Sequence, residues 1–130
     1  MKIENLIKEC LIDSFIYGFG IGSEIPFIDF AKKKENETYR LWIDSDWIIS
    51  GISFDSNLTE EQVEVLKLNE LRNLNILSVK LNKENDLTLG LEEDLYLTIS
   101  GNPKDQSIYE PIRLYKTNPE SRVIWISDRK

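Results

Sequence analysis

The chain of 130 residues contains no histidine and one cysteine, Cys10. Without histidine there can be no Ser-His-Asp or Cys-His nucleophilic site and no histidine general base. One cysteine cannot form an internal disulfide or complete the ligand set of a usual zinc site, and its apolar neighbours predict a small buried side chain. We therefore expect no metal, no cofactor and no enzymatic activity.

The sequence also lacks a long apolar run and an excess of bases. The charge-free run from Ser14 to Ser23 has ten residues and includes three glycines, which is too short to span a bilayer. Glu4 and Glu9 interrupt the segment where a secretory signal would be apolar. The formal net charge of -7 argues against nucleic acid and anionic membrane as partners, because both require a basic surface. We expect a cytoplasmic protein.

What is present predicts one folded domain, 1–130, of the α+β class with a mostly antiparallel sheet. The apolar share of 41% and the charged share of 30% are ordinary for such a domain. Apolar spacing predicts a short helix near the N-terminus, and Thr59 with Gln62 forms a capping-box pattern for a second helix ending near Leu68. Alternating or apolar runs predict strands at 15–21, 26–31, 39–44, 47–54, 76–81, 87–91, 95–100, 112–116 and 123–127.

Two local patterns refine this fold. The segments 1–56 and 69–127 align weakly as an internal repeat, which predicts two duplicated β-rich halves joined by the second helix. Gly18, Gly20 and Gly22 share one face of the first strand, where glycine indicates a bulge or the close approach of another backbone, so we expect a bend there. No helix signal or lysine-serine pair follows them, so they do not predict a phosphate-binding loop.

The stretch from Leu41 to Leu66 is the most distinctive part of the chain. It has six acids, two tryptophans and no base, and residues 1–65 hold 13 acids and 6 bases whereas residues 66–130 hold ten of each. If Leu41, Ile43, Ile48 and Ile52 face the core, then Trp42, Asp44, Trp47 and Ile49 face outward beside the acidic first turn of the helix. The alternative is that another element covers the tryptophans.

An exposed aromatic cluster with an acidic rim suits a basic protein partner, since apolar burial supplies affinity and charge supplies association rate and selectivity. The predicted partner-binding residues are Trp42, Asp44, Asp46, Trp47, Asp55, Glu60, Glu61 and Glu64. Asp44-Ser45-Asp46 resembles the start of a calcium loop, but Trp47 and Ile48 then occupy positions that require oxygen ligands or glycine.

The order of strands and turns from Leu71 to Ser100, then Tyr109 to Tyr115 and Val123 to Ile126, resembles small bacterial β-rich domains of unknown function. Some of these are similar to immunity proteins of polymorphic toxins. The resemblance implies a non-enzymatic cytoplasmic protein that neutralises a cognate toxin by covering its surface, and a basic, nuclease-like toxin would match an acidic face. The sequence leaves open two alternatives: a self-associating module, such as a homodimer formed through a strand edge, and a small carboxylate-based hydrolase or ligand-binding domain.

Overall fold

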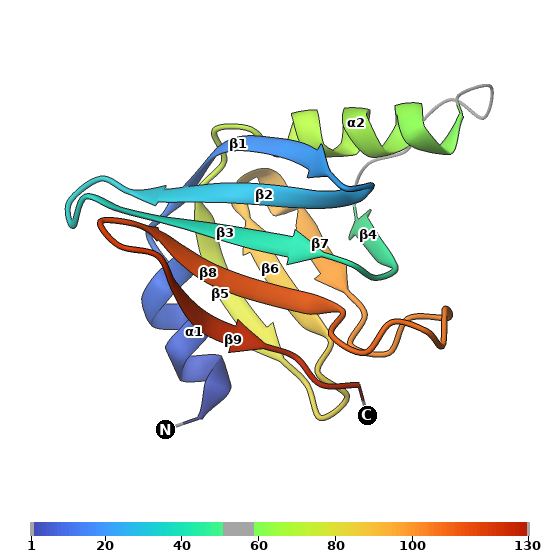
Figure 1. Cartoon of the computed structure of the whole chain (residues 1–130). Coiled ribbons are helices and arrows are strands. Elements are labelled where there is room, and N and C mark those ends of the chain that lie inside the picture. Colours follow the sequence, from blue (N-terminus) through green and yellow to red (C-terminus); the bar gives the residue numbers. More distant parts are fainter. Residues whose placement is uncertain (1, 51–58, 130) are drawn as a thin grey trace.

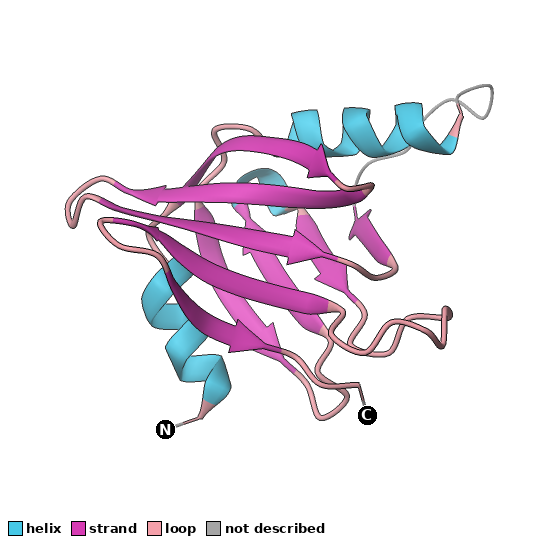
Figure 2. Ribbon diagram, in the orientation of Figure 1, coloured by secondary structure: helices cyan, strands magenta, loops and turns pink. Residues whose placement is uncertain are grey.

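The computed structural model of the chain describes residues 2–50 and 59–129. Two antiparallel sheets, of five and four strands, stand one behind the other, and two short helices lie at their margins (Figures 1 and 2). The predicted α+β class with a mostly antiparallel sheet is therefore confirmed.

The elements follow in the order α1 (Ile3–Leu11), β1 (Phe15–Gly22), β2 (Ile25–Lys32), β3 (Glu37–Ile43), β4 (Trp47–Ser50), α2 (Glu60–Glu70), β5 (Ile76–Leu81), β6 (Leu87–Leu91), the 3₁₀ turn η1 (Glu92–Asp94), β7 (Tyr96–Ile99), β8 (Ile112–Asn118) and β9 (Arg122–Ile126). The five-stranded sheet has the order β1-β2-β3-β8-β9, and the four-stranded sheet has the order β4-β7-β6-β5. Each sheet thus takes strands from both halves of the chain. The single domain and the internal repeat stay predictions.

The core lies between the two sheets. Alternate residues of β3 and β8 point into it, and Leu41 and Leu114 at its centre are fully buried. Leu89 and Leu97 meet them from the four-stranded sheet and are also fully buried. Because successive strand residues point to opposite faces, the intervening residues of β3 and β8 lie on the outer face of the five-stranded sheet. In Figure 1 neither described helix covers that face.

The predicted orientation of β4 is wrong. Ile49 is 7% exposed and belongs to the core, whereas Ile48 is 60% exposed. Pairing with β7 sets these faces, because Ile49 pairs with the buried Leu97 and Ile48 pairs with Thr98. Three consecutive apolar residues at the start of β4 give no alternation from which the inward face could have been predicted. Ile52, the remaining residue of that prediction, lies outside the described residues.

The glycine-rich β1 contains the predicted irregularity. Its register with β2 shifts between Ile16 and Gly18, and this bulge leaves Ile16 fully buried. A Cβ atom added at Gly20 would lie 2.5 Å from Cζ of Phe27, and one at Gly22 would lie 3.0 Å from Cη2 of Trp42. The close approach at Gly20 and Gly22 is therefore made by two aromatic rings and not by another backbone.

The second helix is close to its predicted position. It begins at Glu60, directly after Thr59, and ends at Glu70, two residues beyond the predicted end. No described helix is long and apolar enough to cross a membrane.

Candidate functional site

A groove of about 770 Å³ opens at the end of the five-stranded sheet where β3 ends and β8 begins. Its lining residues are Ile25, Asp44, Asp105, Ser107, Ile108, Tyr109, Glu110, Arg113 and Asp128. We call it the acidic groove, because four carboxylates and one guanidinium line it. One of the predicted partner-binding residues, Asp44, is among them.

Hydrogen bonds to backbone groups hold the two sides of the acidic groove together. The Asp44 N–H donates to the carbonyl of Pro111 at 2.8 Å, which fixes the end of β3 against the start of β8. The loop between β7 and β8 is held by Asp46, whose Oδ2 accepts the N–H of Lys104 at 2.8 Å, and by Arg129, whose Nη1 donates to the carbonyl of Ile108 at 3.1 Å. Long-range pairing of β3 with β8 thus brings acids from both halves of the chain to one place.

The acids of the groove differ in what they contact. The side-chain and backbone donors of Ser107 hold the pKa of Asp105 below its usual value, so this carboxylate is ionised at neutral pH. The carboxylates of Asp44 and Glu110 make no hydrogen bond or ion pair with the described part of the chain. Tyr109, which also lines the groove, is 74% exposed. The groove therefore offers unpaired negative charge beside an exposed aromatic ring.

An aromatic surface adjoins this groove on the outer face of the five-stranded sheet. The rings of Phe27 and Trp42 lie 4.9 Å apart between centroids, and the guanidinium of Arg40 lies 3.9 Å from the Phe27 centroid. Arg40 is fixed by Asp29, with Nε to Oδ1 at 2.8 Å and Nη2 to Oδ2 at 3.0 Å. We call Phe27, Arg40 and Trp42 the aromatic platform. Both rings are partly exposed.

Arg113 joins the acidic groove to the aromatic platform. Its guanidinium carbon lies 5.9 Å from the Trp42 ring centroid, and the same side chain lines the groove. Its Nε is buried and has no acceptor among the described residues. Such a donor is costly to leave unpaired.

The predicted residues Asp46 and Trp47 lie elsewhere. Both line a separate pocket of about 220 Å³ beside Ile48, on the four-stranded sheet. Trp47 packs against the core, with the ammonium of Lys67 5.4 Å from its ring centroid. The predicted outward cluster of Trp42, Asp44, Trp47 and Ile49 is therefore not formed. The structure keeps Trp42 near Asp44 and separates them from Trp47.

The absence of bases from Leu41 to Leu66 does not leave the tryptophans among acids. Arg40 and Lys67, the residues just outside this stretch, each lie over a tryptophan ring, and Arg113 reaches Trp42 from the neighbouring strand. Asp55 lies outside the described residues. Glu60, Glu61 and Glu64 belong to α2, of which only the backbone is described at these positions. The acids that sequence reasoning missed are Asp105, Glu110 and Asp128.

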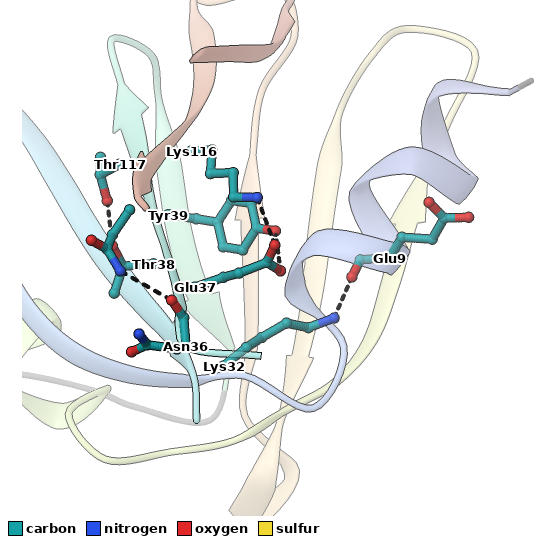
Figure 3. Close-up of polar contacts among 9 residues, drawn as sticks. Glu9, Lys32, Asn36, Glu37, Thr38, Tyr39, Lys116 and Thr117 are labelled. Atoms are coloured by element: carbon teal, nitrogen blue, oxygen red, sulfur yellow. Dashed lines mark hydrogen bonds and ion pairs between the residues drawn. The ribbon is translucent and has the colours of Figure 1, made fainter. Parts of the chain in front are cut away.

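A second polar cluster ties β3 to β8 and lies apart from the groove (Figure 3). Glu37 accepts hydrogen bonds from the Tyr39 hydroxyl at 3.0 Å and from the Lys116 ammonium at 2.6 Å, and both lower the pKa of its carboxyl group. Nearby, the ammonium of Lys32 donates to the carbonyl of Glu9 and so holds α1 against β2. Burial is the main cause that raises the pKa of the Tyr39 phenol. These bonds are satisfied within the fold, which indicates a structural role.

A larger groove, of about 810 Å³, lies beside the turn between β2 and β3. Lys32, Lys33 and Lys34 line it together with Asp13 and Glu35, and it contains none of the predicted partner-binding residues. Within residues 2–50 and 59–129 no three cysteine or acidic side chains are placed to hold a metal ion.

No protein-family model, curated protein or solved structure matches the chain.

Proposed function

We propose that the chain is a non-enzymatic protein-binding domain of the cytoplasm, of the kind that acts as an immunity protein by covering the surface of a basic, nuclease-like toxin. The observation that carries this proposal is the acidic groove, in which Asp44 meets three acids from the C-terminal part of the chain beside the exposed ring of Tyr109. Charge of one sign around an exposed aromatic anchor favours a partner surface of the opposite sign.

The chemistry of the groove supports binding better than catalysis. A carboxylate that acts as a general acid needs a raised pKa. The pKa of Asp105 is lowered instead, and hydrogen bonds also lower the pKa values of Glu4 and Glu37 elsewhere in the fold. Ionised carboxylates at an open surface attract a cationic partner over about one Debye length, which is roughly 8 Å at physiological salt.

The proposal is tested by affinity capture from the source cells with the purified chain as bait. The groove variant Asp44→Lys, Glu110→Lys removes two carboxylates that bond to nothing within the described residues. Its matched control is Glu35→Lys, Glu120→Lys, which changes the net charge equally at two exposed turns. Both turns lie at the opposite end of the five-stranded sheet (Figure 1).

We expect wild type and the control variant to recover the same basic protein in equal molar amount, and the groove variant to lose it. The recovery should fall as salt is raised, because screening weakens exposed charge pairs. Circular dichroism of the three baits is measured to check that each is folded. Equal recovery by the groove variant, or recovery of no basic protein by wild type, would refute the proposal.

A further inference from the structure

The acidic groove and the aromatic platform form one continuous surface with two kinds of chemistry. Arg113 belongs to both, since it lines the groove and lies over the ring of Trp42. A small polycation could neutralise the groove but has no ring of its own to pack on the platform. A flat apolar surface could cover the rings but would leave the carboxylates of Asp44 and Glu110 without a cation.

We infer that this combined surface receives an extended basic segment of the partner, which places arginine side chains at the acidic groove and an apolar ring against the aromatic platform. The inference rests on the proposed function and names the element through which the partner docks. An extended segment suits the site because its side chains and its backbone carbonyls are presented along one line.

Charge complementarity selects the basic side chains. Four carboxylates line the groove with one guanidinium, that of Arg113, and Arg129 lies near Asp105, so the acids outnumber the nearby bases and a segment that brings positive charge is favoured. Arginine fits better than lysine, because its planar guanidinium can bond both oxygens of a carboxylate and stack on the exposed ring of Tyr109.

The platform selects the apolar ring. Its two rings pack against Gly20 and Gly22, which have no Cβ atoms to keep them away, and Arg40 lies over both rings. Arg40 is itself fixed by two bonds to Asp29, so the platform is ordered before any partner arrives. A preorganised aromatic surface loses little side-chain entropy when another ring packs on it.

The unpaired donor of Arg113 supplies the third requirement. Its buried Nε has no acceptor among the described residues, and the terminal Nη donors of this partly exposed side chain make no hydrogen bond there either, so they can meet a carbonyl of the segment. A polyamine has no acceptor to offer. This difference separates a docked peptide from a cation held by charge alone.

The test is a titration of the ¹⁵N-labelled chain, followed by amide and indole N–H shifts, with the peptide Ac-GRGFGRG-NH₂. Two control ligands are the same peptide with glutamate in place of arginine, and spermine. We expect saturable shifts at Gly20, Gly22, Asp44 and Tyr109 and at the indole N–H of Trp42, with the arginine peptide only. The variant Asp44→Asn, Glu110→Gln should weaken this binding roughly fivefold or more, since it removes two exposed charge pairs.

Shifts confined to the groove, equal shifts with spermine, or no saturable shifts would each overturn the inference. These results are separable from those of the capture experiment. Capture of a basic protein that needs Asp44, together with a peptide that leaves the platform unchanged, refutes the extended segment and keeps the proposed function. Specific peptide binding without a captured basic protein refutes the proposed function alone.

Discussion

The glycines under the aromatic platform give the sharpest prediction of stability. Replacing Gly20 by alanine places a Cβ atom 2.5 Å from Cζ and 2.8 Å from Cε2 of Phe27, well inside contact distance. The Phe27 ring cannot retreat freely, because it packs against Trp42 at 4.9 Å and under Arg40 at 3.9 Å. Overpacking of this kind costs about 1 to 3 kcal/mol.

Gly18→Ala is the matched control, since a Cβ atom there meets nothing within 4 Å. Both substitutions stiffen the unfolded chain similarly, by about 0.4 to 1 kcal/mol in favour of folding, so this contribution cancels in the comparison. We expect Gly20→Ala to unfold in urea with a free energy about 1 to 3 kcal/mol below that of Gly18→Ala. Its near-ultraviolet circular dichroism should also change, because the ring packing is altered. Equal stabilities and unchanged spectra would refute the packing of rings over glycine.

Three further predictions concern the contacts that hold the groove and the sheets. Gly101→Ala should lower the free energy of unfolding by about 3 kcal/mol or more, because its Cβ atom would lie 2.2 Å from the backbone oxygen of Glu84; a urea midpoint equal to that of wild type would contradict this. Glu37→Gln should lower the free energy of unfolding at pH 7. This loss relative to wild type should shrink as the pH falls below the ordinary carboxyl pKa of 4.5 and through the lowered pKa of Glu37. A loss that does not change between pH 7 and pH 3 would count against the bond to Lys116. Asp46→Ala should lower the free energy of unfolding, measured by thermal unfolding, by about 1 kcal/mol, because it removes the acceptor of the Lys104 N–H. It should also speed amide exchange in the loop between β7 and β8. Unchanged exchange in that loop would show that this hydrogen bond does not hold it.

The order of the elements along the chain, and their limits, could be predicted from local patterns. Turn-forming segments bounded β5 and β6 at the predicted residues, and the alternation of Tyr39, Leu41 and Ile43 gave the inward face of β3 correctly. The glycine alternation in β1 indicated the irregularity that the structure shows as a bulge. Each of these features depends on residues near one another in the chain, which is why sequence reasoning could reach them.

The site depended on pairings that no local pattern contains. Asp44 and Glu110 are 66 positions apart, and the register of β3 with β8 brings them to one groove. The same register places Arg113 opposite Trp42, so that a tryptophan in a stretch without bases has a guanidinium over its ring. Counting charges along the chain predicted the residue Asp44 but not its neighbours in space.

The order of the strands within each sheet could not be predicted from local patterns either. Strands far apart in the chain lie side by side, since β4 pairs with β7 and β3 pairs with β8. Alternation fixes which side chains share a face, but it does not say which strands pair. The orientation of β4 was lost for this reason, since only its partner Leu97 identifies Ile49 as the inward residue.

The most direct test of the central claim is the amide-exchange footprint of the captured partner on this chain. We expect slower exchange on binding at Asp44, from 105 to 113, and at the edge of the platform around Gly20 and Gly22. Exchange in β5 and β6 should not change. Protection of the four-stranded sheet, with the acidic groove unchanged, would contradict the claim that this groove is the binding surface.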